Sequence, residues 1–226
     1  MKNPPEAIGT SGFLHEEAAF RYSIAHQDFN DRIVNVLSLA FAREPMSAAV
    51  GLSAPQLRPL VARFVPECTT NDLSVIATPV DEPSTLAGIF ICRDFKSPLP
   101  DGVLDDVPQF RPIADALRTV DEAYESRIPR LALGDAVDLW MVGVAPGDQF
   151  TNRGIATNLF RLVARERGFR RCVTECTGHY SQAAARKAGL KERARLAYRD
   201  FRFEGRAIFA GIQPPHTGII LFEKEF

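Results

Sequence analysis

Long apolar runs are missing from this chain of 226 residues, and no stretch approaches the length needed to span a bilayer. Residues 1–6 are polar, include two prolines and have no apolar core of the kind found in a secretory signal. We therefore expect a cytoplasmic location and no membrane partner. Apolar residues make up 46% of the chain and charged residues 24%, which is ordinary for a globular protein and argues against disorder.

Cysteine and histidine are scarce, with four residues of each. Four cysteines are too few for a disulfide scaffold of this length, and the histidines form no HxH or HExxH pattern. Cys172 and Cys176 lie four residues apart without a second pair at metal spacing nearby. Reduced, buried thiols are preferred over a zinc site, and we expect no metal.

The net charge is also close to zero, at −1, but positive and negative residues are unevenly distributed along the chain. Residues 151–226 hold 15 Lys and Arg against 7 Asp and Glu, a net of +8, which leaves 12 and 21 in residues 1–150, a net of −9. Such a division favours two ligands of opposite sign. The arginines at 161–171 are read as a solvated helix face or as partners of a phosphate, and no basic run is interleaved with aromatics, so we expect no nucleic-acid partner.

The length predicts a single domain over residues 1–226, with residues 1–18 loosely ordered. The periodicity of apolar residues and the positions of Gly, Pro and Ser predict an alternation of helices and strands. Helices are expected at about 29–44, 54–65, 113–126, 154–167 and 181–188, and strands at 20–24, 73–78, 85–92, 137–144, 169–176, 190–203 and 217–226. The order predicts an α/β (α+β) fold with a mixed central sheet of about seven strands, parallel in the middle and ending in an antiparallel hairpin.

The sharpest local signal is the turn from the strand at 137–144 into the helix at 154–167. Gly154 allows close approach to the backbone, and the first helical amides have no internal acceptors. Together with the helix dipole and Arg153, they form a binding site for an anion such as a pyrophosphate. The alternative is a plain strand-to-helix turn. No Lys-Ser/Thr follows the glycine, as a P-loop requires, and the dinucleotide fingerprint lacks its first two glycines.

This region resembles the GNAT superfamily of acyl-CoA-dependent N-acyltransferases. The family turn, Arg/Gln-x-x-Gly-x-Gly/Ala, is matched by residues 151–156 at Gly154 and Ala156, whereas Thr151 stands at the first position. Lys187-Ala188-Gly189-Leu190 stands where the family has Lys-x-Gly-Phe.

The resemblance is closest to the insect arylalkylamine (dopamine) N-acetyltransferases. Residues 176–181, Cys-Thr-Gly-His-Tyr-Ser, are similar to their Cys-Ser-Ser-His-Tyr-Ser, and residues 215–219 are similar to their Pro-His-x-Gly-Ile. Residues 43–46, Arg-Glu-Pro-Met, resemble their Asp-Glu-Pro-Leu, and the helix at 113–126 has a counterpart there. The resemblance is close over residues 137–226 and fragmentary before them.

The resemblance implies the GNAT fold and acetyl-CoA as co-substrate. It implies that the backbone of the splayed strand and the following turn hold the cofactor, with the Val142 amide polarising the thioester carbonyl. Gly143 is read either as a place of close ligand approach or as a bulge. The expected cofactor-binding residues are Val142, Gly143, Val144, Thr151, Asn152, Arg153, Gly154, Ile155, Ala156 and Thr157.

Catalytic roles also follow from the resemblance. Glu44 is the expected general base, a role that a carboxylate can fill when burial raises its pKa. Ser181 is the expected general acid, Tyr180 is the alternative acid, and Thr177 stands where the subfamily has a second functional Ser. His179 and His216 are expected to be structural or to line the substrate site.

Three functions remain open at this point. The first is acetyl transfer to the primary amine of a small molecule, with arylalkylamines among the candidates. The others are a catalytically silent CoA-binding sensor or scaffold, and a protein or peptide N-acetyltransferase. An acidic loop with Asp101, Asp105 and Asp106 is expected to attract the ammonium substrate. The chain is expected to be a monomer or a homodimer.

Overall fold

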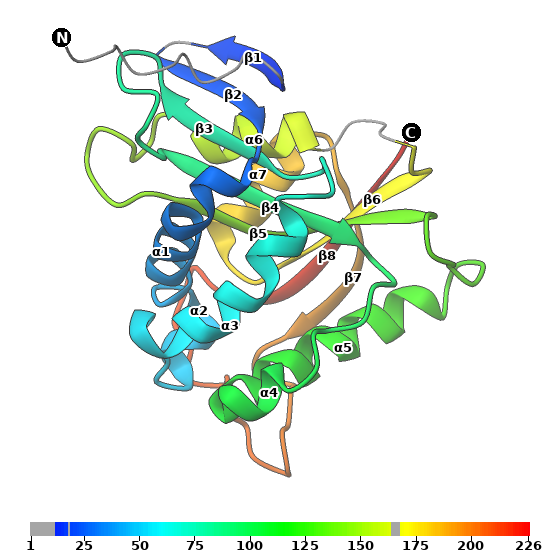
Figure 1. Ribbon diagram of the computed structural model, residues 1–226. Coiled ribbons are helices and arrows are strands. Elements are labelled where there is room, and N and C mark those ends of the chain that lie inside the picture. The colour runs from blue at the N-terminus through cyan, green and yellow to red at the C-terminus, as the bar shows by residue number, and fades with distance from the viewer. Residues whose placement is uncertain (1–11, 18, 164–167) are drawn as a thin grey trace, which may run out of the picture.

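The computed structural model describes residues 12–17, 19–163 and 168–226. One mixed sheet forms its centre, in the order β1-β2-β3-β4-β5-β6-β8-β7 (Figure 1). All neighbouring strands are antiparallel except β5 and β6, which run parallel. The strands are β1 (Phe13–Glu17), β2 (Phe20–Ile24), β3 (Val75–Pro79), β4 (Gly88–Asp94), β5 (Ala136–Val144), β6 (Arg171–Cys176), β7 (Lys191–Ala197) and β8 (Gly218–Glu225).

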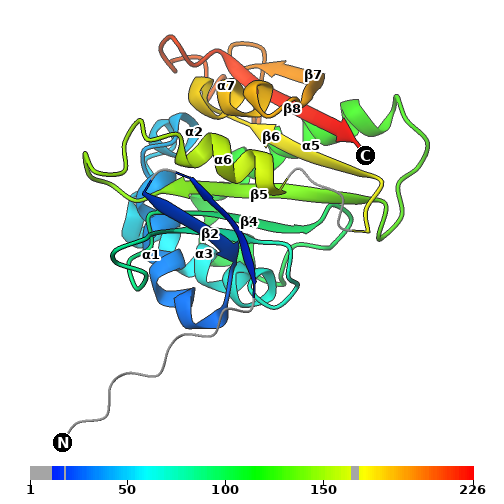
Figure 2. The same cartoon turned by 90° about the horizontal axis from the view of Figure 1, so that it is seen from above.

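Helices cover both faces of this sheet, as the view in Figure 2 shows for α6 and α7 on one side of β5 and for α1 and α3 on the other. The helices are η1 (Gln27–Phe29), α1 (Asn30–Phe41), α2 (Pro45–Ala49), α3 (Ala54–Cys68), α4 (Val103–Asp106), η2 (Pro108–Phe110), α5 (Arg111–Glu125), α6 (Ile155–Val163) and α7 (His179–Lys187). The predicted mixed α/β architecture, the parallel central pair and the C-terminal hairpin of β7 and β8 are confirmed.

The N-terminal edge differs from the prediction. The sheet has eight strands rather than about seven, because Phe13–Glu17 pairs with β2. The expectation that residues 1–18 are loosely ordered is therefore wrong for this strand, while residues 1–11 and 18 lie outside the described residues. The strand escaped prediction because its side chains are mostly exposed and give no buried alternation.

Several predicted boundaries also move. Pro66 does not end α3, which continues to Cys68. The predicted loop at 95–109 contains α4 and η2, and the short helix α2 was not predicted. Of the predicted helix at 154–167, α6 accounts for Ile155–Val163, and residues 164–167 lie outside the described part of the chain.

A bulge and a separation of strands interrupt the middle of the sheet. Ile91 pairs with Met141 and Cys92 with Leu139, so Trp140 is an extra residue on β5 without a partner on β4. On the opposite side of β5, pairing with β6 covers only Ala136 to Asp138. Beyond this point the two parallel strands separate, and within the described residues the second half of β5 has no strand partner on that side.

Two glycines set how closely helices approach this separated region. A Cβ at Gly143 would lie 3.0 Å from Leu37 Cδ2 and 3.3 Å from Ala40 Cβ, both on α1. A Cβ at Gly88 would lie 2.7 Å from Ile155 Cγ2, at the start of α6. Gly143 therefore allows α1 to pack closely on β5, and the bulge on this strand lies at Trp140 instead, whereas close approach of a ligand at Gly143 stays a prediction. Gly88 lets α6 lie close to β4.

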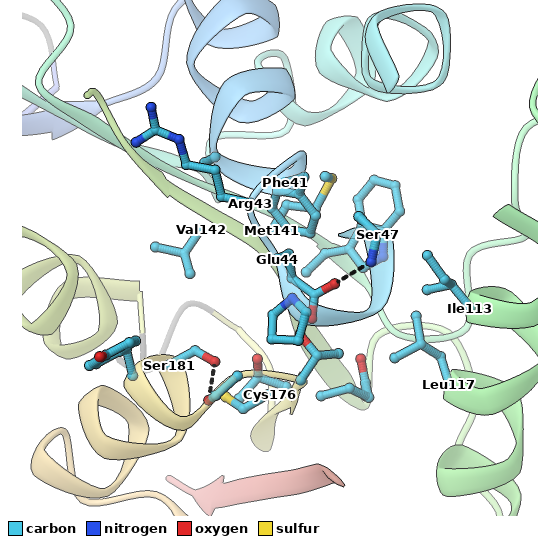
Figure 3. A pocket seen from close by; sticks show the side chains of 18 of the residues that line it. Phe41, Arg43, Glu44, Ser47, Ile113, Leu117, Met141, Val142, Cys176 and Ser181 are labelled. Atoms are coloured by element: carbon cyan, nitrogen blue, oxygen red, sulfur yellow. Dashed lines mark hydrogen bonds between the residues drawn. The ribbon is translucent and has the colours of Figure 1, made fainter. Parts of the chain in front are cut away.

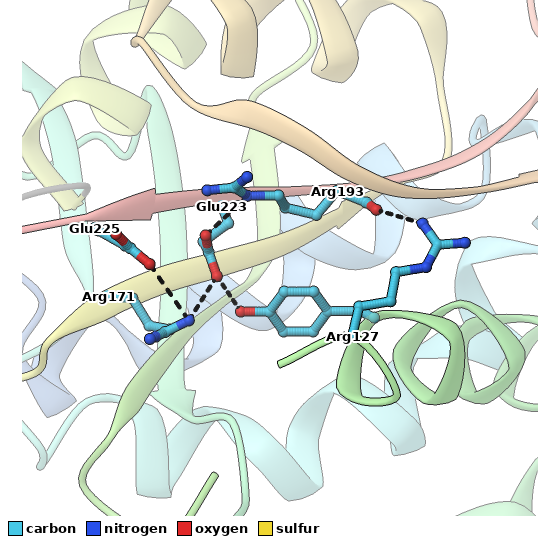
Figure 4. A network of polar contacts seen from close by, with 6 residues as sticks. Arg127, Arg171, Arg193, Glu223 and Glu225 are labelled. Atoms are coloured by element: carbon cyan, nitrogen blue, oxygen red, sulfur yellow. Dashed lines mark hydrogen bonds and ion pairs between the residues drawn. The ribbon is translucent and has the colours of Figure 1, made fainter. Parts of the chain in front are cut away.

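A buried ion network fixes the other half of the sheet (Figure 4). Glu223 on β8 has a side chain that is 1% exposed, and it accepts hydrogen bonds at 2.9 Å from both Arg171 Nη1 and Arg193 Nε. Tyr124 Oη on α5 donates to the same carboxylate. The Glu223 carboxylate thus connects β6, β7, β8 and α5, which holds the α5 helix against the sheet.

All four cysteines are buried: Cys68, Cys92, Cys172 and Cys176. Burial raises the pKa of Cys172 and Cys176 to about 12, so both remain protonated at neutral pH. Within residues 12–17, 19–163 and 168–226, no helix combines the length and the apolar character of a membrane span.

Candidate active site

A cavity of about 400 Å³ lies where β5 and β6 separate. Its walls come from both faces of the sheet, with the ends of α1 and α2, the helix α5 and the start of α7 (Figure 3). Apolar side chains form much of the wall on the α1, α3 and α5 side: Phe41, Leu60, Phe110, Ile113, Leu117, Trp140 and Met141. Polar side chains gather where β6 ends, and they include most of the predicted catalytic residues.

Glu44 stands at the N-cap of the short helix α2 and lines this cavity. Its Oε2 accepts hydrogen bonds from the amides of Met46 at 2.9 Å and Ser47 at 3.0 Å. Its Oε1 is buried and has no hydrogen-bond partner of normal geometry among the described residues. Burial raises the pKa of Glu44, and the Thr177 hydroxyl and the two amides act in the opposite direction. A carboxylate that lines a cavity and has a raised pKa has the properties of a general base.

Thr177 and Tyr198 complete the surroundings of this carboxylate. Thr177 follows the end of β6 and lines the cavity. Tyr198 Oη donates a hydrogen bond to the Thr177 carbonyl. Burial and the negative charge of Glu44 both raise the pKa of Tyr198, so its phenol stays protonated. Tyr198 was not predicted as a site residue because its contact with Glu44 joins residues far apart in the sequence.

Ser181 extends into the same cavity from α7 (Figure 3). Its hydroxyl donates to the Gly178 carbonyl at 2.9 Å. The N-cap of α7 is Gly178 rather than Ser181, so the Ser181 side chain does not cap the helix. The hydroxyl also lies beside the buried thiol of Cys176, which places it close to the separated strands.

The aromatic residues of the 176–181 motif lie at the mouth of the cavity. Tyr180 is 74% exposed and its ring centroid lies 5.9 Å from that of His216. His216 Nδ1 accepts a hydrogen bond of 3.1 Å from the His179 amide, at the first turn of α7. Tyr180 and His216 both line the cavity, whereas the His179 side chain does not. The two histidines therefore join the C-terminal loop to the start of α7.

The predicted phosphate turn lies at the surface, outside this cavity. Asn152 and Gly154 have positive φ values of 58° and 79°. The Thr151 hydroxyl donates to the Gly147 carbonyl at 2.9 Å, which fixes the beginning of the turn. The first intrahelical bond runs from the Asn158 amide to the Gly154 carbonyl, at 3.0 Å. Within the described chain, the amides of residues 154–157 have no backbone acceptor, which is the arrangement that binds anions.

The structure brings together only some of the predicted residues. Glu44, Val142, Thr177, Tyr180, Ser181 and His216 line one cavity. Gly143 and Val144 belong to the same strand but do not line it, and Thr151, Asn152, Arg153, Gly154, Ile155, Ala156 and Thr157 form a separate turn. Within the described residues, no three His, Cys, Asp or Glu side chains are grouped in a way that could hold a metal ion.

Comparison with solved structures identifies the fold, although no protein-family model and no curated protein sequence matches the chain. Arylalkylamine N-acetyltransferase 2 from Aedes aegypti is 20% identical with a TM-score of 0.74, and the match covers 92% of this chain and 99% of that one. The C-terminal condensation domain of Ebony, solved with beta-alanyl-dopamine, is 13% identical with a TM-score of 0.77 and the same coverage. Polyamine N-acetyltransferase from Drosophila melanogaster is 17% identical with a TM-score of 0.70, covering 92% of this chain and all of that one.

These similarities show that the chain has the GNAT N-acetyltransferase fold, in the form found in arylalkylamine N-acetyltransferases. The fold predicted from the motifs at 137–226 is therefore confirmed. The similarity extends over the first half of the chain as well, where the sequence motifs were fragmentary.

Proposed function

We propose that the protein is an acetyl-CoA-dependent N-acetyltransferase that moves the acetyl group directly to the primary amine of a small molecule, with arylalkylamines among the candidate acceptors. The observation that carries this proposal is the buried Glu44 carboxylate, which lines the cavity beside the separation of β5 and β6. This placement puts a base next to an unpaired strand edge on the fold of amine acetyltransferases.

The proposed acetyl-CoA site has two parts that fit the ligand chemically. The free amides of residues 154–157, the helix dipole and Arg153 suit the pyrophosphate. The unpaired side of β5, including Val142 and Val144, suits the amide groups of pantetheine, because both are hydrogen-bonding chains. In this arrangement the Val142 amide polarises the thioester carbonyl.

Glu44 takes the proton that the amine loses as its nitrogen bonds to the acetyl carbon. The reacting amine has to be neutral, and the raised pKa of Glu44 makes proton transfer from an ammonium more favourable than with an ordinary carboxylate. Thr177, beside the carboxyl, positions the base or a water next to it.

Ser181 supplies a proton to the CoA thiolate when the carbon–sulfur bond breaks. Its hydroxyl lies by the separated strands and is held by the Gly178 carbonyl, which supports this role. Tyr180 is the alternative acid, and its exposure favours contact with the ligand at the mouth of the cavity instead. His216 and His179 shape the substrate side of the site.

The cavity favours a small acceptor. Its volume of about 400 Å³ and its apolar wall between α3 and α5 fit an amine with an apolar body. Of the similar proteins, one acts on arylalkylamines and another is a polyamine N-acetyltransferase that forms N-acetylagmatine. A small primary amine is therefore preferred over a protein substrate.

The proposal is tested by following CoA thiol release from acetyl-CoA with a panel of arylalkylamines, alkylamines and diamines. We expect turnover with at least one class and formation of the N-acetyl product. Tight CoA binding without thiol release from any of these amines, or from peptides with free amino termini, would contradict the enzyme proposal in favour of a silent CoA-binding protein. Turnover of the peptides alone would contradict the small-molecule acceptor.

A further inference from the structure

A second cavity, of about 490 Å³, adjoins the first on the face of the sheet that carries α3 and α5. The two cavities share wall residues Phe110, Leu117, Trp140 and Glu175. An acceptor bound beside Glu44 can therefore extend along an apolar wall into the second cavity. The bulged residue Trp140 stands between the two spaces.

Three acidic side chains from different elements line the second cavity. They are Asp121 on α5, Asp138 on β5 and Glu175 on β6. Asp138 is only 8% exposed, and its Oδ1 is buried without a hydrogen-bond partner. Asp121 and Glu175 are also withdrawn from solvent, and they form a hydrogen-bonded pair of carboxyls in which Asp121 carries the proton. A buried, unsatisfied carboxylate oxygen is rare, so Asp138 Oδ1, beside a second pair of acids, calls for a ligand that donates a hydrogen bond to it.

The electrostatics show that these acids lack sufficient positive charge. Burial, the charge of Glu175 and the hydrogen bond to it raise the pKa of Asp121 to about 10. Burial and the charge of Asp138 raise the pKa of Glu175 to about 8, although the hydrogen bond from Asp121 lowers it. Burial and the charge of Asp121 raise the pKa of Asp138. Arg93 and Lys96 oppose these shifts only in part. Arg93 Nη2 donates to the carbonyls of Ser97 and Pro98, and Lys96 pairs with Glu125 at 2.8 Å.

The other charged groups of the cavity wall are engaged at its rim. Arg111 pairs with Asp105, and Arg118 pairs with Glu122 and with the half-buried Asp115. The three buried acids do not converge as a metal-binding group among the described residues. An organic cation can donate hydrogen bonds in several directions, and so can reach both Asp138 and the Asp121–Glu175 pair.

We infer that this acidic cavity binds a second cationic group of the acceptor, so that the preferred acceptor is a diamine, or an amine with a guanidinium group, joined by an apolar spacer. The inference rests on the proposed acetyl transfer at Glu44. Glu175 precedes Thr177 by two residues, which corresponds to roughly 6.6 Å of extended chain. Glu175 lines both cavities, so a spacer of a few methylene groups connects the two sites.

Matched acceptors test the inference. Cadaverine is pentylamine with a second terminal amino group, so the pair differs only in the second cation. We expect kcat/KM for cadaverine to exceed that for pentylamine by about tenfold or more, the effect of hydrogen bonds between charged groups. Asp138→Asn and Asp121→Asn should each reduce this ratio, whereas Glu122→Gln, on the solvent side of α5, should not.

Proton release on binding gives a second test of the inference, one that does not depend on turnover. Cadaverine binding to the CoA-bound protein, measured by calorimetry in two buffers of different ionisation enthalpy, should release protons from the acid cluster, and pentylamine should not. Equal ratios in the wild type and both variants, with no proton release, would overturn the inference while leaving acetyl transfer intact. Absence of turnover with every amine would instead overturn the proposed function.

Discussion

The Ser47 amide donates a hydrogen bond to Glu44 Oε2 at 3.0 Å, so the residue expected to act as the base also begins helix α2. One oxygen of the carboxylate is thereby fixed by the backbone, and the other is left buried at the cavity. A glutamine at this position keeps an oxygen that can accept from the amides but cannot take up a proton. The capping and the proton-transfer roles can therefore be separated by one substitution.

Glu44→Gln is expected to lower kcat by about a hundredfold or more, the usual contribution of a general base, with CoA affinity nearly unchanged. Because burial raises the pKa of Glu44, activity of the wild type should fall as pH decreases through that raised value. The Glu44→Gln variant should not show this decrease in activity at low pH. Steady-state kinetics across pH and calorimetric titration with CoA measure both effects.

Glu67→Gln, at an exposed position near the end of α3, is the matched control and should leave kcat unchanged. If Glu44→Gln weakened CoA binding as much as turnover, Glu44 would be a structural residue.

Ser181→Ala and Tyr180→Phe distinguish the two candidate acids. We expect Ser181→Ala to reduce kcat by about a hundredfold, and Tyr180→Phe to change it little, because Ser181 extends into the cavity and Tyr180 is largely exposed. Single-turnover measurement of thiol release isolates this step. The reverse order of effects would assign the acid to Tyr180.

Gly154→Ala tests the turn at the start of α6. Gly154 has a φ of 79° and no atom within 4 Å of an added Cβ, so the substitution introduces backbone strain without a clash. We expect a stability loss of about 1 kcal/mol and a clear weakening of CoA binding. Gly134→Ala, at φ 86° and equally open, should cost the same stability without affecting CoA. Equal CoA affinity in both variants would remove the phosphate role from the turn.

Glu223→Gln tests the network that holds α5. Burial alone would raise the pKa of Glu223, but Tyr124, Arg193 and Arg171 outweigh it and hold this pKa below its usual value. The carboxylate therefore stabilises the fold above its unfolded pKa of about 4, and this stability is lost as pH falls further. We expect the variant to lose about 1.5–3 kcal/mol at neutral pH in urea unfolding. Glu225→Gln, on a 62% exposed side chain, should change little.

Asp121→Asn tests the acid cluster, for which stability is expected to change with pH in the direction opposite to that for Glu223. The raised pKa values of Asp121 and Glu175 mean that wild-type stability is complete below about pH 4 and decreases as pH rises toward 8 to 10. The variant should be more stable than the wild type at pH 8 and should depend less on pH. Thermal unfolding between pH 5 and 9 measures this, and an unchanged slope would show that Asp121 does not titrate with the cluster.

The sequence predicted those parts of the fold and site whose signals are local. The strand, turn and helix around Gly154 follow from punctuation and periodicity, and Glu44, Thr177 and Ser181 follow from short motifs that resemble a known family. The five-residue helix α2 was missed because it spans little more than one turn and gives no periodic pattern.

Long-range groupings could not be predicted in the same way. The acidic loop at 101–106 was expected to attract the ammonium substrate, but Asp105 and Asp106 pair with Arg111 and Arg63 on exposed side chains. The acids that are buried come instead from α5, β5 and β6. Their proximity depends on how α5 packs across the sheet, which no local pattern records.

Gly88, which never lines the cavity, fixes a distance that the proposed reaction needs. Because the Ile155 side chain of α6 packs directly on Gly88 of β4, the start of α6 and the free amides of the turn are held close to the sheet. A methyl group at position 88 would lift the helix and lengthen the span between the two parts of the proposed acetyl-CoA site. The absence of a side chain at position 88 thus sets the distance between the two parts of the proposed acetyl-CoA site, and with it the length of ligand that can span them.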